Sequence, residues 1–456
     1  MRRKIFANRV YELTLLNKIW NEKGFALVLM YGRRRVGKTR LLMEFSSNKK
    51  CIYYTAIEGS YERMCEEFSK IIKKTLNMPV SGDVIEVIEW ISEASDEKLL
   101  IIIDEFQYLA EADPSFLSRL QRSIDNVLIN RNLLLVLCGS SVSFFQKKLL
   151  GYRSPIFGRR AVSIKLSPLK FRDIHSFFPE YSIEDLVKVY GIVGGTPAYL
   201  LKLDPQKNIE ENLYRIIVPN EYLYDEAINF LRQEVREPKT YFNILLSIAE
   251  GVKGLSAIAR ESFIDARSIV KYIALLEELD IVERIRPLGC RRPVFLDFKD
   301  NYFRFWFSYI YKYRSMLESG LIDEAIEEIV DTFNTYLSKI FEKLVIEIIP
   351  LMFKAKLIPV KPVEIGRWWH KDIEIDCIIR KPGKMTGFIE VKWRNISFNE
   401  AEGILMNLEK KSVKTGLTST QNYYILICKN FEEKTPVKID EYKIVIDLNG
   451  LKPIIF

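Results

Sequence analysis

"YGRRRVGKTR", residues 31–40, decides the fold of the first part of the chain. Gly32, Gly37, Lys38 and Thr39 fit the pattern G-x-x-x-x-G-K-[ST], in which backbone N–H groups surround a phosphate. A short apolar run precedes the loop, and apolar residues at helical spacing follow it. The pattern therefore predicts a phosphate-binding loop between a buried strand and a helix.

The two residues that end the pattern have expected roles in binding a nucleotide. Lys38 is expected to reach the β and γ phosphates, and Thr39 to ligate Mg²⁺. Arg40 follows and is counted among the nucleotide-binding candidates. Arginines also fill positions 33–35, although Lys38, the helix start and Mg²⁺ already offset most of a triphosphate's charge. At most one of these three is expected to face the phosphates; the others contact an acidic partner or a neighbouring subunit, or are solvated.

A second motif, "LLIIIDEF" at residues 99–106, predicts another buried strand with carboxylates at its end. Ligands of open α/β sheets bind at the carboxyl ends of the strands. Asp104 is expected to hold Mg²⁺ through water, and Glu105 to polarise the water that attacks the γ-phosphate. The alternative is that the two carboxylates only cap a helix that begins near Phe106.

A third predicted strand, "LLLVLCGSS" at residues 133–141, also ends in polar residues. Ser140 is a candidate to contact the γ-phosphate or the attacking water, or else is a turn residue. The segment "SPIFGRR" then brings Arg159 and Arg160, which join the catalytic candidates.

Composition limits the class of protein. With 456 residues, of which 48% are apolar, the chain can bury several cores, and its net charge of +8 favours an acidic partner. The six cysteines show no C-x-x-C spacing, which argues against a zinc site or a disulfide framework. No apolar run is long enough to span a bilayer, so we expect a cytoplasmic protein with no membrane association.

The middle of the chain is predicted to be helical and then to change pattern. Residues 166–233 have the apolar spacing of a helical lid, and residues 234–300 read as three helices and a two-stranded ribbon, a winged helix. Its basic residues suit contact with DNA phosphates, unless the module only packs against its neighbours. They are Arg267, Lys271, Arg284, Arg286, Arg291 and Arg292.

The last part of the chain, residues 336–456, carries a second set of carboxylates. Glu390 and Lys392 are two residues apart, so on a strand both point to one face. A hairpin centred on Gly383 places Asp376 opposite Glu390, and two such carboxylates favour a shared Mg²⁺. The alternative is a surface ion network in an inert fold.

The order of these motifs resembles the archaeal P-loop ATPase family, an AAA-related group of the STAND or SWACOS type. "FANRVYEL", with Arg9 and Glu12, is similar to its adenine-side motif, and "GRRRVGKT", "IDEFQ", "GSS" and "SPIFGRR" follow in order. The resemblance implies ATP as the nucleotide. It also implies that the G-x-P element ending at Pro197 packs a helical lid over the base.

The C-terminal residues resemble the restriction-endonuclease-like domain, of the PD-(D/E)XK kind, that accompanies such ATPases. Glu342 on a helix, Asp376, Glu390 and Lys392 match its spacing. The resemblance implies a Mg²⁺-dependent nuclease with these as catalytic residues, Asp376 and Glu390 being the metal ligands.

The expected fold is multidomain α/β: a P-loop core (1–165), a helical lid (166–233), a winged helix (234–300), a helical connector (301–335) and a nuclease-like domain (336–456). The expected function is an ATP-binding and ATP-hydrolysing switch that acts on DNA, as a homo-oligomer or with a protein partner. The alternative is a nucleotide-governed regulatory binding module whose nuclease-like domain is inert.

Overall fold

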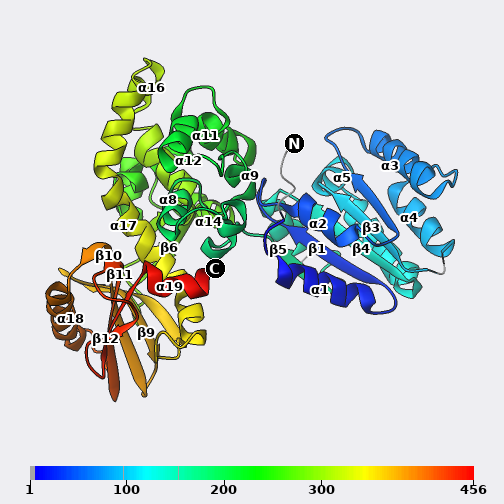
Figure 1. Cartoon of the computed structure of the whole chain (residues 1–456). Coiled ribbons are helices and arrows are strands. Elements are labelled where there is room, and N and C mark those ends of the chain that lie inside the picture. The colour runs from blue at the N-terminus through cyan, green and yellow to red at the C-terminus, as the bar shows by residue number, and fades with distance from the viewer. Residues whose placement is uncertain (1–5, 96, 153) are drawn as a thin grey trace. The chain divides into compact units, whose positions relative to one another are not determined.

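The computed structural model describes residues 6–95, 97–152 and 154–456. The chain divides into two compact units, Met1–Pro168 and Leu169–Phe456, shown together in Figure 1. The division at 168/169 lies three residues from the predicted end of the P-loop core. Across the described residues, no helix is both long enough and apolar enough to cross a membrane.

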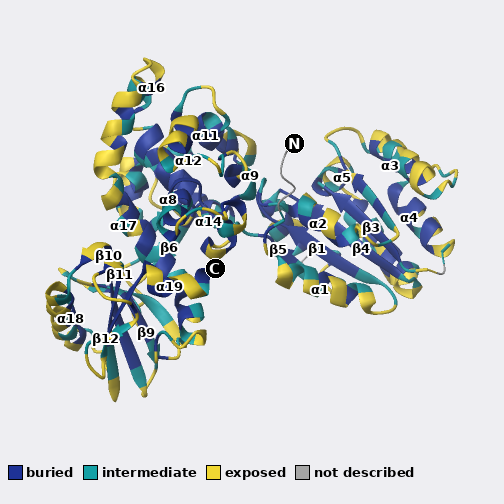
Figure 2. Cartoon of the chain, viewed as in Figure 1, coloured by how far each residue is buried: buried dark blue, intermediate teal, exposed yellow. Residues whose placement is uncertain are grey.

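The first unit is built on a five-stranded sheet in the order β2-β3-β4-β1-β5, with every neighbouring pair parallel. The strands are β1 (Ala26–Tyr31), β2 (Cys51–Thr55), β3 (Leu99–Asp104), β4 (Leu133–Gly139) and β5 (Val162–Lys165). Every residue of β3 and β4 is buried, as Figure 2 shows by colour. Strands covered on both faces are continuous apolar runs, which explains why the sequence predicted them.

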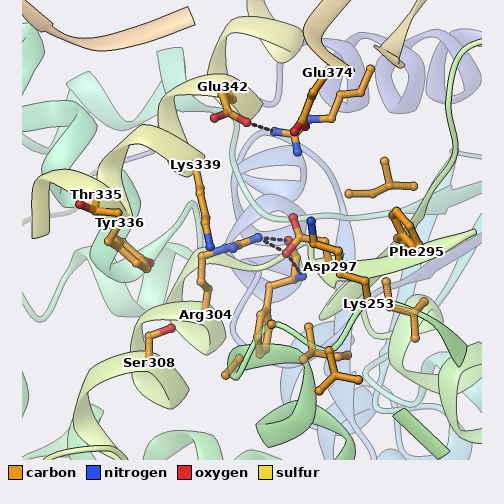
Figure 3. Close-up of a pocket in the computed structure, with 18 of the residues that line it drawn as sticks. Lys253, Phe295, Asp297, Arg304, Ser308, Thr335, Tyr336, Lys339, Glu342 and Glu374 are labelled. Carbon is orange, nitrogen blue, oxygen red and sulfur yellow. Dashed lines mark hydrogen bonds and ion pairs between the residues drawn. The ribbon is translucent and has the colours of Figure 1, made fainter. Parts of the chain in front are cut away.

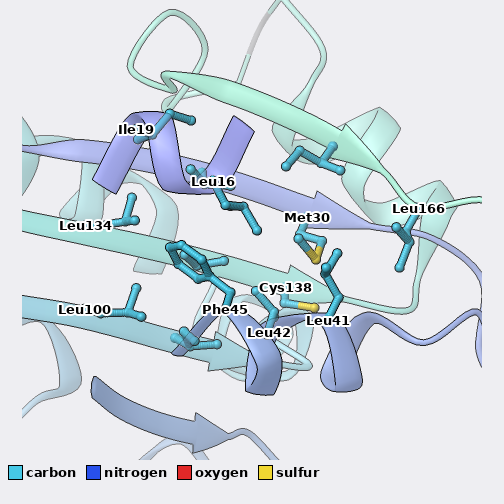
Figure 4. Close-up of a cluster of buried hydrophobic side chains, with 14 of the residues drawn as sticks. Leu16, Ile19, Met30, Leu41, Leu42, Phe45, Leu100, Leu134, Cys138 and Leu166 are labelled. Carbon is cyan, nitrogen blue, oxygen red and sulfur yellow. The ribbon is translucent and has the colours of Figure 1, made fainter. Parts of the chain in front are cut away.

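Helices connect these strands and cover the sheet. They are α1 (Val10–Asn21), α2 (Lys38–Ser46), α3 (Tyr61–Leu76), α4 (Val84–Glu93), α5 (Gln107–Ala112), α6 (Phe116–Asn126) and the short η1 (Leu128–Asn130), α7 (Val142–Phe144) and η2 (Phe145–Leu149). Leu41, Leu42 and Phe45 of α2 pack with Leu16 of α1 against the sheet (Figure 4). This packing fixes the start of α2, and with it the loop of residues 32–37.

The second unit begins with helices, as predicted for the lid. These are η3 (Phe171–Phe177), α8 (Ile183–Val193), α9 (Pro197–Leu200), α10 (Ile209–Ile217) and α11 (Tyr222–Glu234). The expected three helices and ribbon follow as α12 (Pro238–Ala249), α13 (Leu255–Glu261), α14 (Ile269–Glu278) and the hairpin of β6 (Val282–Ile285) and β7 (Phe295–Phe298).

A long helix leads into the C-terminal part. After α15 (Asn301–Phe305), η4 (Trp306–Ile310) and α16 (Arg314–Glu318), α17 (Ile322–Lys354) runs for 33 residues. The boundary expected at 335/336 therefore falls inside one helix. Its apolar positions continue across that boundary, so nothing in the packing separates a connector from the next domain.

The C-terminal part is a six-stranded mixed sheet in the order β12-β13-β11-β10-β9-β8. Its strands are β8 (Glu364–His370), β9 (Ile373–Lys381), β10 (Met385–Ile396), β11 (Gln421–Phe431), β12 (Val437–Lys438) and β13 (Lys443–Asp447). The helices α18 (Phe398–Val413) and α19 (Leu448–Ile455) complete it. Ala401, Leu405 and Leu408 of α18 pack into a buried cluster with the sheet.

The packing of α2 predicts the cost of opening the first core. Phe45 is 2% exposed within the core, whereas Met43 on the same helix is 51% exposed. Phe45→Ala should lower the free energy of unfolding of the first unit by about 3–5 kcal/mol, because it removes buried area and leaves a cavity. Met43→Ala is the matched control and should change it by less than about 0.5 kcal/mol in denaturant titrations. Equal losses for the two variants would contradict this packing.

Candidate nucleotide site and carboxylate site

The phosphate loop and the end of β3 meet at one edge of the first sheet. Thr39 Oγ1 donates a hydrogen bond to Asp104 Oδ2 at 2.9 Å. Strands β1 and β3 flank β4 in a parallel sheet, so their carboxyl ends lie at the same edge. Tyr53 of β2 also donates to Asp104 Oδ2, at 2.7 Å. Burial, with the nearby Asp104 carboxylate, raises the pKa of Tyr53, which keeps this donor protonated.

The loop itself has a backbone that only small residues tolerate at two points. Gly37 has φ 95°, in the left-handed region that favours glycine, and it caps α2. A Cβ on Gly32 would lie 2.3 Å from the carbonyl oxygen of Leu166. Lys38 Nζ donates to the carbonyls of Gly32 at 2.7 Å and Arg33 at 3.1 Å, so its ammonium group crosses the loop.

Glu105 is held by a set of hydrogen bonds that the sequence did not predict. Its Oε2 accepts from Ser140 Oγ at 2.8 Å, from the Ser140 backbone N–H at 3.1 Å and from Gln107 Nε2 at 2.6 Å. Its backbone is in the left-handed region, with φ 51°. Ser140 was expected to contact a phosphate or a water, and here it positions Glu105. Gln107 ends the "IDEFQ" motif and begins α5, but the motif gave it no role of its own.

Three further residues, Arg9, Arg40 and Pro197, were predicted to bind the nucleotide. Arg9 NH2 donates to the carbonyls of Val36 at 3.1 Å and Ser167 at 2.7 Å, so Arg9 lies beside the loop. Arg40 pairs with Glu44 one turn along α2, at 3.3 Å, with both side chains 42% exposed. Pro197 begins α9 in the second unit, and its role at the nucleotide base stays a prediction.

The arginines of the loop and of "SPIFGRR" have separate environments. Arg33 is 2% exposed, so solvation, one of the roles left open for the three loop arginines, does not apply to it. Arg159 makes two hydrogen bonds to Asp125 of α6, at 2.7 and 2.8 Å. Arg160 lies over the ring of Phe157, 5.1 Å from its centroid. Over the part of the chain that the structure describes, no hydrogen bond or ion pair joins Arg159 or Arg160 to Thr39 or Asp104.

The second unit brings the predicted carboxylates of β9 and β10 together. The antiparallel register pairs Ile389 with Cys377, and one further step places Asp376 across from Glu390 on the same face. The Val391 backbone N–H donates to Asp376 Oδ2 at 2.7 Å. The geometric condition for a shared site, two opposed carboxylates on one face, is therefore met.

Cations surround these carboxylates. Lys392 Nζ donates to Glu390 Oε1 at 2.8 Å, and Lys411 of α18 approaches both Glu390 oxygens at 3.4 Å. On α17, Glu342 accepts from Arg367 NH2 of β8 at 2.7 Å. Lys411 and Arg367 were missed because nothing in the local sequence marks either as a partner of residues far along the chain.

Asp376, Glu390 and Glu342 form one electrostatic group. Burial, followed by the charges of Glu390 and Glu342, raises the pKa of Asp376 to about 7. Burial also raises the pKa of Glu342, against the opposing effect of Arg367. Two carboxylates that resist ionisation together are a place where a divalent cation would relieve repulsion.

Both sites offer oxygen donors of the kind that Mg²⁺ takes. In the described ranges, no group of three or more His, Cys, Asp or Glu residues is placed to hold a metal ion. Mg²⁺ commonly keeps several waters and takes only one or two carboxylates, which Asp376 and Glu390 supply. In the first unit, the Thr39 hydroxyl and the Asp104 carboxylate fit a Mg²⁺ bound with nucleotide phosphates. Both sets of residues fit the ion.

The comparisons with known proteins show what this chain is similar to. The sequence profile of an ATPase domain found predominantly in Archaea matches residues 6–203. Uncharacterized protein MJECL04 of Methanocaldococcus jannaschii is 33% identical over 438 residues, covering 94% of this chain and 97% of that protein. The chain belongs to this archaeal ATPase family. Its residues 306–404 match a second profile, of archaeal and bacterial proteins of unknown function.

Two further proteins are similar to parts of the archaeal ATPase. Uncharacterized ATP-binding protein MJ0423 of the same organism is 52% identical over 46 residues, which are 10% of this chain and 78% of that protein. The Walker-type ATPase PABY2304 of Pyrococcus abyssi superposes with a TM-score of 0.51 at 19% identity, covering 67% of this chain and 97% of that one. The latter similarity shows a shared fold: a multidomain α/β protein with a parallel-sheet P-loop core.

The raised pKa of Asp376 predicts how the stability of the archaeal ATPase depends on pH. Between about pH 4 and pH 7 the unfolded chain has lost this proton, while the folded protein still holds it. The free energy of unfolding therefore falls as the pH rises through this window. The variant Asp376→Asn carries no titrating proton at this position. The difference in free energy of unfolding, variant minus parent, should therefore rise by up to about 4 kcal/mol from pH 4 to pH 7.5. Urea titrations across this range that show a constant difference would contradict the assignment.

Proposed function

We propose that this archaeal ATPase binds and hydrolyses ATP with Mg²⁺ at the edge formed by the phosphate loop and the end of β3. The hydrogen bond between Thr39 and Asp104 is the observation that carries this proposal, because it joins the two motifs that must share one ion. Lys38 and the N–H groups of the loop bind the β and γ phosphates. When bound, Mg²⁺ supplies charge neutralisation at those phosphates.

Glu105 is the residue we assign to the water. Three donors from Ser140 and Gln107 anchor its Oε2, which fixes the carboxylate and leaves Oε1 to accept a proton from the attacking water. Ser140 is thus a positioning residue in this arrangement. Arg9, which lies beside the loop, is assigned to the adenine side of the nucleotide. Arg159 and Arg160 are assigned to stabilising the phosphate charge of a nucleotide bound by a neighbouring copy or partner.

The role of Glu105 gives the first functional prediction. Glu105→Gln keeps the shape and the phosphate loop, so ATP binding should persist, while hydrolysis should fall by roughly 100-fold or more because the water loses its proton acceptor. Lys38→Ala should instead lose ATP binding. Phosphate release and nucleotide binding are measured in parallel, with Glu86→Gln, exposed on α4, as the control. Hydrolysis by Glu105→Gln at the parent rate would show that another group handles the water.

For the second unit we propose Mg²⁺-dependent hydrolysis of DNA phosphodiesters. Asp376 and Glu390 would hold the ion, since they oppose each other on adjacent strands. Lys392, whose Nζ lies 2.8 Å from Glu390 Oε1, would orient the attacking hydroxide and stabilise the negative charge on the phosphorane oxygens. Glu342, on α17, would help to hold the metal ion at Asp376 and Glu390. The support for this proposal is one face that carries two carboxylates and a cation, with Asp376 driven toward neutrality by its neighbours.

Separate sites predict separable activities. Asp376→Ala should abolish Mg²⁺-dependent nicking of a plasmid while the rate of ATP hydrolysis stays near that of the parent, because the two sites lie in different units. Glu402→Ala, exposed on α18, is the control that keeps both activities. Nicking that survives in Asp376→Ala would remove these carboxylates from the reaction.

A regulatory binding module is the second candidate, and the ion pairs favour it. Glu390 is already paired with Lys392 and Lys411, and Glu342 with Arg367, as in a structural network. In this case the second unit binds a partner under control of the nucleotide and cuts nothing. The absence of nicking in the parent, together with an ATPase rate that DNA leaves unchanged, would select this candidate.

We assign DNA contact to the module of α12, α13, α14 and the β6–β7 hairpin, interpreted as a winged helix. Arg286, Arg291 and Arg292 are exposed on the hairpin loop. Arg284 is less available, since it pairs with Glu277 at 3.1 Å. Arg267 lies in the turn before α14, whereas Lys271 lies on the helix itself.

The hairpin loop gives a salt-dependence prediction. Replacing Arg291 and Arg292 by Ala should lower the slope of log affinity for duplex DNA against log salt by roughly two, because two phosphate contacts are removed. The matched double variant, Lys73→Ala with Lys74→Ala on the exposed face of α3, should leave the slope unchanged. A titration in which both double variants keep the parent slope would place the DNA footprint elsewhere.

A further inference from the structure

The second unit contains a cavity of about 850 Å³ whose wall includes one predicted site residue, Glu342. Its walls come from the turn after α12, the β6–β7 hairpin, residues 304–312, α17 and the strands β8 and β9 (Figure 3). Its volume falls within the roughly 300–1,000 Å³ typical of ligand pockets. It can receive a few unpaired nucleotides, and it is too small for a duplex.

Lysines line this cavity without being used in ion pairs. Lys253, Lys312, Lys339 and Lys371 all contribute to the wall. Among the residues that the structure describes, no ion pair involves any of these four. By contrast, Arg304 and Arg367 on the same wall are bound by Asp297 and Glu342. Asp331, Asp372 and Glu374 also line the cavity, so its charge is mixed, and the lysines are the cations left for an anionic ligand.

An aromatic platform stands beside these lysines. Phe295 of β7 and Trp369 of β8 are stacked, with ring centroids 5.3 Å apart and ring planes inclined by 14°. Lys253 Nζ lies 5.9 Å from the Phe295 centroid. Stacked aromatic side chains next to cations are the common means by which proteins hold unpaired bases.

Two buried donors lack partners at this wall. Trp369 Nε1 and Arg304 Nε are both buried, and neither has a hydrogen-bond partner in the described structure. Arg304 as a whole is only 7% exposed. Both nitrogens are shielded from solvent, so they lie behind the cavity surface and not on it.

The cavity adjoins the carboxylate site through Glu342. Glu342 lines the cavity, and its charge is one cause of the raised pKa of Asp376. Lys339, one turn earlier on α17, lies close enough to Glu342 that its charge opposes the rise in the pKa of Glu342 that burial causes. A strand lying in the cavity would therefore pass its backbone toward Asp376 and Glu390.

We propose that this cavity binds the unpaired end of a nucleic acid strand, with a base against Phe295 and Trp369 and phosphates on Lys339 and Lys371. The inference deepens the nuclease proposal by naming the substrate as single-stranded or frayed nucleic acid. It rests on that proposal only for the direction in which the strand runs; binding itself needs no cleavage.

The test measures binding without cleavage. The full-length protein, with no added divalent cation, is titrated into a fluorescent DNA single strand of roughly ten nucleotides, a length within the site sizes of such binders. Trp369→Ala should weaken binding roughly tenfold or more through loss of stacking. Lys339→Ala with Lys371→Ala should lower the salt slope by about 1.4, for two phosphate contacts on a single strand. Trp369→Phe, which keeps a ring, should bind like the parent.

Controls separate the possible outcomes. Lys361→Ala with Lys384→Ala, two exposed lysines outside the cavity wall, should bind like the parent. Parent affinity in both Trp369→Ala and the cavity lysine variant would overturn the proposal, as would failure of the parent to bind the single strand. Equal competition by a mononucleotide would identify a small-nucleotide pocket and also overturn it. Loss of nicking in Asp376→Ala tests the nuclease proposal separately, since strand binding is measured without metal.

Discussion

The hydrogen bond from Thr39 to Asp104 is the contact on which the first unit depends for its chemistry. It exists because β1 and β3 run parallel on either side of β4, so that a loop and a strand end 65 residues apart reach one edge. Burial of the whole of β3 holds Asp104 at 3% exposure, and Tyr53 adds a second donor to the same oxygen. A carboxylate held this firmly is preorganised for an ion rather than free to turn away.

The second unit depends on α17 in a similar way. Lys343 donates to Glu283 at 2.6 Å and forms an ion pair with Asp297 at 3.0 Å, which docks the helix on the hairpin. The preceding residue, Glu342, faces the carboxylate group, and Glu347 accepts from the Phe171 backbone N–H at 2.9 Å. One helix thus contacts the start of the unit, the hairpin and the carboxylates.

Strong local patterns allowed the sequence to predict much of this. Continuous apolar strands, the glycines of the loop and the two-residue spacing of Glu390 and Lys392 follow from local rules, and the register around Gly383 was confirmed. Contacts between distant segments could not be predicted: Asp125 with Arg159, or Lys411 with Glu390, depend on how helices pack. The boundary predicted at 335/336 falls inside α17, because a helical period carries no mark where one domain gives way to another.

The most direct test of the central claim is calorimetric titration of a non-hydrolysable ATP analogue with and without Mg²⁺. The account predicts that Mg²⁺ raises the affinity of the parent by roughly tenfold or more, and that this gain is largely lost in Asp104→Asn, whose fold and phosphate loop are retained. An equal gain from Mg²⁺ in the parent and in Asp104→Asn would contradict it, because the ion would then be held without the carboxylate that Thr39 contacts.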